Sequence, residues 1–252
     1  MKAVPDVAAL RGDEDPNPDE PGASGPASDR RLAIEAHGLA LEGRRGRVYG
    51  PLDLTVEQGS MLLVTGPAGS GRTALLLTLA GRLRPSKGSR LTVLGHELPA
   101  RARAVQHASS AVGFAGLDDL DEEVSVGATV REREAWLAPW YAVVRRPDDA
   151  HVAQVCGRVF SGLQVPRARQ AVHDLDETSN LLLRISLAML SNPSLLVIDD
   201  LDQLRDADNR LRVWESLQRL SRRDGVTVVV ASSTAREISR LDDPPSHLVL
   251  TR

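Results

Sequence analysis

The chain has 252 residues, and 42% of them are hydrophobic, so it can fill the core of one large domain or two small ones. Its 31 basic and 34 acidic side chains give a formal net charge of -3, which excludes the positive excess of a nucleic-acid-binding protein, and no nucleic-acid partner is expected. The single cysteine, Cys156, excludes an internal disulfide and any cysteine-rich metal site.

Residues 1–30 differ in composition from the rest of the chain. They hold five prolines and seven acidic residues. Such a segment buries too little apolar surface to offset the entropy lost on folding, so we expect a disordered acidic tail. It has no apolar run that could act as a signal, and no later stretch approaches the roughly 18 uninterrupted apolar residues of a membrane span. The sequence therefore predicts a cytoplasmic protein.

Beyond residue 30 the pattern indicates strands that alternate with helices. Alternating apolar residues predict half-buried strands near 32–36 and 52–56, and the continuous apolar run Met61–Thr65 is typical of a strand buried on both faces. Helices are expected over 73–83, within the strand-free stretch 129–191, and over 208–222. The remaining predicted strands are Leu91–Leu94, Ala111–Phe114, Leu195–Ile198, Val226–Ala231 and Leu248–Leu250. This order predicts an α/β fold with a parallel core sheet and a helical insertion.

A glycine-rich segment connects the strand at 61–65 to the next helix. Its glycines let backbone N–H groups turn inward, and the helix N-terminus adds positive potential, so such a loop cradles phosphates. The pattern is G-x-x-x-x-G-K-[ST] with arginine in place of lysine, and the threonine is expected to bind Mg²⁺. A tight turn without a ligand is the alternative. The predicted nucleotide-binding residues are Gly66, Pro67, Ala68, Gly69, Ser70, Gly71, Arg72 and Thr73.

Two acidic residues follow the buried strand Leu195–Ile198. Ligands of parallel α/β sheets bind at the carboxyl ends of the strands, which is where Asp199 and Asp200 stand. Asp199 fits a Mg²⁺-holding carboxylate, and Asp200 fits the position of a general base. An acidic strand end without a metal is the alternative.

Further segments point to one known family. Residues 129–132 (T-V-R-E) are similar to the segment that opens its helical subdomain, Ile185–Pro193 is similar to the run before its acidic strand end, and Asp206 falls on its D-loop aspartate. Over about residues 31–252 the chain resembles the ATP-binding subunit of ABC transporters. The resemblance implies a P-loop NTPase fold of the ABC type, with a parallel core sheet, an antiparallel β subdomain and a helical subdomain over about 118–191.

The resemblance also implies ligands and partners. The cofactors would be ATP and Mg²⁺, the partners an integral-membrane permease subunit and a second ATP-binding subunit in a homo- or heterodimer, and the location the inner face of the cell membrane. Trp136, Trp140 and Tyr141 lie in the neighbourhood that receives the permease in this family. Packing inside the helical subdomain is favoured over docking for these residues, because aromatic side chains usually belong to the core.

Several positions depart from the family. Arg72 replaces the P-loop lysine, and a planar guanidinium cannot take the same pose. Asp200 replaces the catalytic glutamate, which leaves its carboxylate about 1 Å too far from a water. Ser233 replaces the switch histidine and offers no cation, and Leu117 replaces the Q-loop glutamine. No aromatic residue stands at the adenine-stacking position, for which Tyr49 is the nearest candidate.

The family's signature sequence, L-S-G-G-Q, falls on residues 175–179 and has changed most. Asp176 and Glu177 place two carboxylates where the family presents a serine and glycine amides to ATP. Asp176 is expected to cap its own helix and to neutralise its dipole. An approaching ATP would meet like charge, so we expect no signature function.

These departures predict ATP binding with impaired or absent hydrolysis. Each lost donor to a developing charge costs roughly 2.7–4 kcal/mol in comparable enzymes, and no pairing of subunits would rebuild a complete site. The backbone cradle, Thr73 and Asp199 survive. Two alternatives remain open, an active transport ATPase and a scaffold or regulatory pseudo-ATPase that binds no nucleotide. A small-molecule kinase is disfavoured, because nothing resembles an acceptor-site lid.

Overall fold

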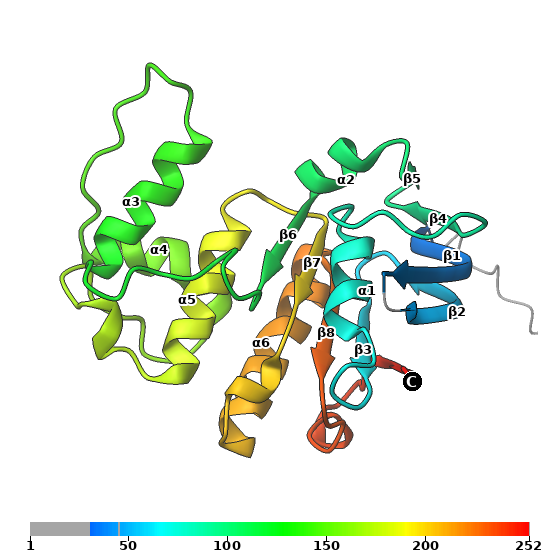
Figure 1. Ribbon diagram of the computed structural model, residues 1–252. Helices are drawn as coiled ribbons and strands as arrows, with labels where there is room; N and C mark the ends of the chain where they lie inside the picture. The colour runs from blue at the N-terminus through cyan, green and yellow to red at the C-terminus, as the bar shows by residue number, and fades with distance from the viewer. Residues whose placement is uncertain (1–30, 45, 252) are drawn as a thin grey trace, which may run out of the picture. The chain divides into compact units, whose positions relative to one another are not determined.

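A parallel sheet of five strands runs through the centre of the computed structural model, which describes residues 31–44 and 46–251 (Figure 1). The tail predicted at 1–30 lies outside the described residues. The strand order is β6-β7-β8-β3-β9, and each neighbouring pair is parallel. The strands are β3 (Met61–Thr65), β6 (Ser109–Val112), β7 (Leu195–Ile198), β8 (Thr227–Ser232) and β9 (Ser246–Val249).

The central strands of this sheet are buried on both faces. On β8, Val228 and Val230 pack into one hydrophobic cluster, while Val229 and Ala231 pack into the other. Residues 61–64 of β3 alternate between the same two clusters. The continuous apolar runs in the sequence are therefore explained by a sheet with a core on each side, as predicted.

An antiparallel sheet and two helices cover one side of the parallel sheet (Figure 1). Helix α1 follows the glycine-rich segment directly and contributes Leu75, Leu76 and Leu79 to the core. The antiparallel strand order is β2-β1-β4-β5. The elements are β1 (Leu32–Gly43), β2 (Gly46–Glu57), β4 (Arg90–Val93), β5 (His96–Leu98), α1 (Arg72–Leu79) and α2 (Ala102–Ala108).

Four helices contribute to the core on the opposite face, and three of them form the helical insertion (Figure 1). The stretch 129–191 was expected to be helical, but residues 138–148 and 161–171 are irregular. Pro139 and Pro147 stand in the first of these segments and Pro166 in the second, and proline interrupts helical hydrogen bonding. The helices are α3 (Val126–Leu137), α4 (Asp149–Phe160), α5 (Glu177–Met189) and α6 (Ala207–Asp224), and 3-10 turns occur at Val172–Asp174, Leu201–Gln203 and Ile238–Arg240.

The expected parallel core, antiparallel sheet and helical insertion are all present. Two short elements, β5 and α2, were not predicted, because three residues of β5 and a seven-residue helix are too short to show a period. No helix in the described part of the chain is both long enough and apolar enough to cross a bilayer.

The same substitution at two positions of the parallel sheet tests the burial argument. Val229→Ala removes two methyl groups from the fully buried β8, so we expect it to lower the free energy of unfolding by about 2 kcal/mol. Val249→Ala, on β9 where the residue is 58% exposed, should change it by less than about 0.5 kcal/mol. Urea unfolding measures both, and equal losses would contradict the two-sided core.

Candidate functional site

Three of the predicted functional segments meet at one edge of the parallel sheet. The register pairs Thr65 with Ser232 and Ile198 with Val230, so β3, β7 and β8 end side by side. The glycine-rich loop leaves β3, the two aspartates leave β7, and Ser233 leaves β8 at this edge. The structure thus brings together the residues that the sequence assigned to the nucleotide.

The glycine-rich loop, residues 66–71, has a backbone that only glycine fits at two positions. Gly66 and Gly71 have φ angles of 159° and 88°, and Gly71 is the N-cap of α1. A Cβ at Gly66 would lie 2.6 Å from the Leu250 carbonyl oxygen, and one at Gly71 would lie 2.5 Å from that of Val48. The Ser70 hydroxyl is buried and has no hydrogen-bond partner among the described residues. The loop is therefore a tight backbone cradle with an unsatisfied polar group inside it.

Thr73 and Asp199 lie next to each other, as the predicted metal site requires. Asp199 is buried, and its backbone N–H donates to the Val112 carbonyl at 2.9 Å, which fixes it against β6. Burial raises the pKa of the Asp199 carboxyl above its ordinary value, although a hydrogen bond with the Thr73 side chain and the charge of Arg72 act in the opposite direction. A buried carboxylate beside a hydroxyl is a donor pair that suits Mg²⁺.

Arg72 faces an acidic side chain that the sequence analysis did not single out. Its Nη1 lies 3.7 Å from Asp202 Oδ2, too far for a hydrogen bond, and this buried Nη1 has no hydrogen-bond partner among the described residues. The Asp202 carboxylate also accepts from the Ser232 hydroxyl at 2.7 Å and from the Ser233 N–H at 2.5 Å. Asp202 therefore joins the P-loop cation to the end of β8. Only its position three residues after Asp199 could have drawn attention to it.

Asp200 and Ser233 lie at the same edge but differ in their surroundings. Asp200 is exposed and has a left-handed backbone, with φ 51°, at the start of the turn Leu201–Gln203. The Ser233 side chain is exposed, while its backbone N–H is held by Asp202. The hydrogen bond to Asp202 thus fixes the main chain at Ser233.

The start of α5 confirms the expected helix cap at Asp176. Asp176 accepts from the backbone N–H groups of Thr178 and Ser179, both at 2.9 Å, and from the Ser179 hydroxyl at 2.8 Å. Burial raises the pKa of Asp176, but these hydrogen bonds outweigh it and hold the pKa below its ordinary value. The first amides of α5 are therefore already occupied by a charged acceptor of the same chain.

Tyr49 does not offer a platform for adenine. Its ring is buried, and its hydroxyl donates to the Thr78 hydroxyl at 2.8 Å. Burial raises the pKa of Tyr49 to about 12. The residue is part of the core beneath the P-loop, which agrees with its late position in the sequence.

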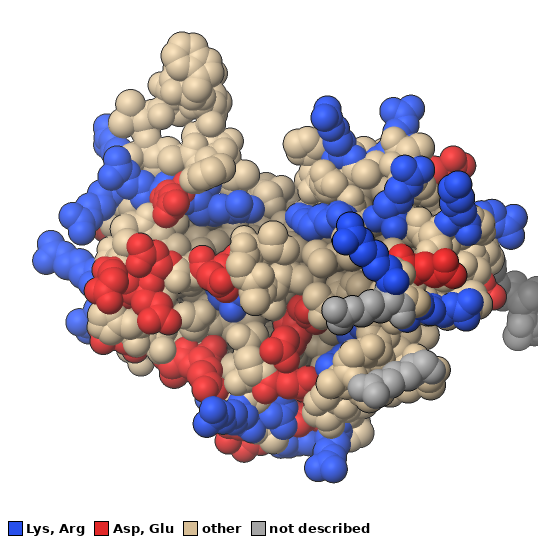
Figure 2. Space-filling model, in the orientation of Figure 1, with Lys and Arg blue, Asp and Glu red and all other residues tan. Residues whose placement is uncertain are grey.

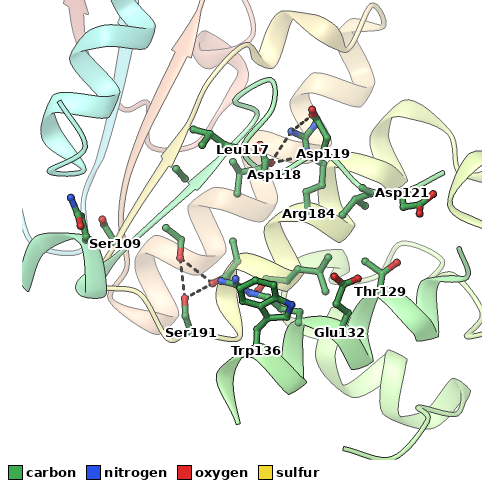
Figure 3. Close-up of a pocket in the computed structure, with 18 of the residues that line it drawn as sticks. Ser109, Leu117, Asp118, Asp119, Asp121, Thr129, Glu132, Trp136, Arg184 and Ser191 are labelled. Carbon is green, nitrogen blue, oxygen red and sulfur yellow. Dashed lines mark hydrogen bonds and ion pairs between the residues drawn. The ribbon is translucent and has the colours of Figure 1, made fainter. Parts of the chain in front are cut away.

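A groove of about 570 Å³ lies between the loop after β6 and helices α3 and α5 (Figure 3). Asp118 organises its wall, because its carboxylate accepts from the N–H groups of Gly113 and Phe114 and pairs with Arg184 of α5 at 2.7 Å. Leu117, at the expected Q-loop position, is exposed and lines the groove. The Asp118–Arg184 pair was not predicted, since its partners are 66 residues apart.

Trp136, Trp140 and Tyr141 are exposed, by 79%, 96% and 72%. The interpretation that they pack inside the helical subdomain is therefore wrong. Trp136 lines the groove, whereas Trp140 and Tyr141 stand beyond it in the loop between α3 and α4. Sequence alone favoured a core role, because most large aromatic residues in domains are buried.

Residues 43–230 match the family model of the AAA ATPase domain. The chain is 30% identical over 208 residues to the hemin import ATP-binding protein HmuV of Myxococcus xanthus (strain DK1622), covering 79% of this chain and 74% of that protein. It is 28% identical over 221 residues to the Nod factor export ATP-binding protein I of Mesorhizobium japonicum (strain LMG 29417 / CECT 9101 / MAFF 303099). That match covers 88% of this chain, which spans 62% of the length of the relative.

Solved structures show the same fold. An ATP-binding cassette of an ABC transporter in its ADP conformation superposes with a TM-score of 0.67 at 14% identity, over 87% of each chain. The cbiO1 protein of Clostridium perfringens, part of an ABC transporter complex, gives 0.66 at 13% identity, over 81% of this chain and 79% of that one. With its P-loop, its ABC cassette fold and these relatives, the chain belongs to the family of ATP-binding subunits of ABC transporters.

Proposed function

We propose that this chain binds Mg-ATP through its modified P-loop as the subunit of a transporter or related membrane complex, with hydrolysis impaired or absent. The proposal rests on the contrast, at the edge of the parallel sheet, between the phosphate- and metal-binding groups and the surroundings of Arg72. The cradle and the Thr73–Asp199 pair are intact, whereas Arg72 faces Asp202 of its own chain.

The residues present fit a phosphate chain and its metal. The Ser70 hydroxyl and Arg72 Nη1 are buried polar groups without hydrogen-bond partners among the described residues, and phosphate oxygens accept hydrogen bonds. The backbone of residues 66–71 and the start of α1 would hold the phosphates, and Thr73 with Asp199 would hold Mg²⁺. When bound, the metal would neutralise phosphate charge.

The same geometry weakens the hydrolytic side of the site. The Arg72 guanidinium is shared with Asp202, so its charge is partly neutralised before any phosphate arrives. Asp200 carries a carboxylate one methylene short of glutamate, and Ser233 offers no cation. Asp176 and Glu177 would present negative charge to an ATP held by a second subunit, which weakens a homo- or heterodimer site built on this α5.

The groove supplies a surface for the permease partner. Leu117 and Trp136 offer exposed apolar area, and acidic side chains of Asp119, Asp121 and Glu132 stand around them (Figure 3). The lining also holds Arg82, Arg133 and Arg184, so a short amphipathic helix with polar residues of both charges, from the cytoplasmic side of an integral-membrane permease, would complement it. In this proposal the helical subdomain, residues about 118–191, carries the docking surface and the chain lies at the inner face of the membrane.

Two measurements test the proposed function. They are calorimetric titration with ATP, with and without Mg²⁺, and a phosphate-release assay. We expect magnesium-dependent binding without steady release, because the cradle and metal ligands are present while the hydrolytic groups are degraded. Thr73→Ala should remove the dependence on Mg²⁺. Failure to bind millimolar ATP would instead favour a nucleotide-free scaffold, and steady phosphate release would favour an active transport ATPase.

The double substitution Arg72→Lys with Asp200→Glu separates binding from turnover. We expect tighter ATP binding but less than about a tenfold rise in phosphate release, because Ser233 and the acidic signature still lack their catalytic donors. Asp208→Asn, which removes one partner of an exposed ion pair on α6, is the control variant and should bind ATP and release phosphate as the wild type does. Turnover typical of a transport ATPase in the double variant would refute the role given to the signature.

Asp202→Asn tests whether the acidic partner restrains Arg72. The substitution removes a negative charge beside the phosphate site and frees the guanidinium, so ATP should bind on the order of tenfold more tightly. Asp208→Asn makes the same change in charge away from the site and should leave the dissociation constant unchanged. A dissociation constant equal to that of the wild type would show that Asp202 does not compete with the phosphates.

The pH dependence of stability tests the burial of Asp199. Because its folded-state pKa is raised, ionisation of Asp199 opposes folding, and its stabilising contribution is present at low pH and lost as pH rises through that pKa. Asp199→Asn should therefore unfold at higher urea concentration than the wild type at neutral pH, with a difference that shrinks toward about pH 4, near the ordinary Asp value. A difference between the two proteins that stays constant from about pH 4 to neutral pH would contradict this account of Asp199.

A further inference from the structure

The loop between α3 and α4, residues 138–148, projects from the helical subdomain and carries its most exposed apolar side chains (Figure 1). The Ala142 N–H donates to the Pro139 carbonyl at 2.8 Å, so Trp140 and Tyr141 occupy the two central positions of a turn. Their rings meet edge to face with centroids 5.8 Å apart. Val143 directly follows this turn and is 90% exposed.

Basic charge predominates in this loop, because its one acidic residue, Asp148, stands at its end and caps α4. No acidic residue occurs between Glu134 and Asp148, whereas Arg145 and Arg146 are both exposed and have no ion-pair partner within 4 Å among the described residues. Arg131 of α3 donates from Nε to the Val144 carbonyl at 3.2 Å and fixes the returning arm of the loop. In Figure 2 the projecting tip is free of acidic side chains, and basic ones stand beside it.

From this combination we infer that the loop is an anchor for an anionic bilayer surface. Tryptophan and tyrosine favour the headgroup region, where one end of the ring is apolar and the other is wet, and arginine is attracted to anionic lipids. The tip is convex, so it suits insertion between headgroups rather than the capture of a helix, for which the neighbouring groove is shaped. The two surfaces meet at Trp136, which lines the groove at the end of α3.

The orientation of the loop rests on the proposed function, because a permease in the groove would place the membrane on this side of the chain. Lipid binding itself does not need the permease or the nucleotide. The protein alone can therefore be tested, and a failure to bind ATP leaves the lipid result unaffected.

Flotation with phosphatidylcholine vesicles, with and without a minority of phosphatidylglycerol, tests the anchor. We expect binding that needs the anionic lipid and weakens with salt, and that falls on the order of tenfold or more in Trp140→Ala/Tyr141→Ala. Arg145→Gln/Arg146→Gln should lower binding by about fivefold per charge. Arg212→Gln/Arg223→Gln, which removes the same charge from exposed sites on α6, is the matched control and should bind as the wild type does.

Fluorescence gives a second, local measurement. In a Trp136→Phe background the remaining tryptophans are Trp140 and the buried Trp214, so quenching by brominated lipids would report contact at the loop. Absence of vesicle binding by the wild type, or equal losses in the loop and α6 variants, would overturn the inference. So would loop variants that bind vesicles normally but no longer bind a permease, since that result would assign the loop to a protein partner.

Discussion

The burial of the parallel sheet on both faces is the constraint on which the rest of the structure depends. Because β3, β7 and β8 have apolar side chains toward both clusters, their polar residues are confined to the strand ends. The glycine-rich loop, Asp199 and Ser233 stand at those ends, where the backbone turns away from the sheet. This edge of the sheet thus collects groups that are far apart in the sequence.

The charged and polar residues at this edge form a connected arrangement. Arg72 pairs with Asp202, which in turn holds Ser232 and the main chain at Ser233. The cation that follows the glycine-rich loop is thereby matched with an anion of the same chain. At the start of α5, Asp176 satisfies amides in the same manner. In both places a carboxylate of the chain offsets positive potential, that of a guanidinium in one case and that of a helix N-terminus in the other.

Local patterns made much of the fold predictable. Met61–Thr65 and Leu195–Ile198 were predicted with the bounds that the structure gives, because a continuous apolar run between turn residues is a strong signal. The loop 66–73 was equally clear from its glycines. Asp202, Asp118 and Arg184 were missed, since their roles depend on partners 30 or more residues away that no periodicity reveals. The exposed aromatic residues were ambiguous for a related reason, because composition does not show which side chains a loop lifts out of the core.

The link between Asp118 and Arg184 has a mechanical consequence. Asp118 accepts hydrogen bonds from the two backbone N–H groups that follow β6, and Arg184 lies about two helical turns into α5. Their ion pair therefore connects the wall of the groove to the middle of that helix. Both side chains are largely shielded from water, so salt should weaken this ion pair less than it weakens an ion pair on the surface. A displacement of the loop after β6 would therefore also displace α5. The helical insertion would then move together with the parallel sheet.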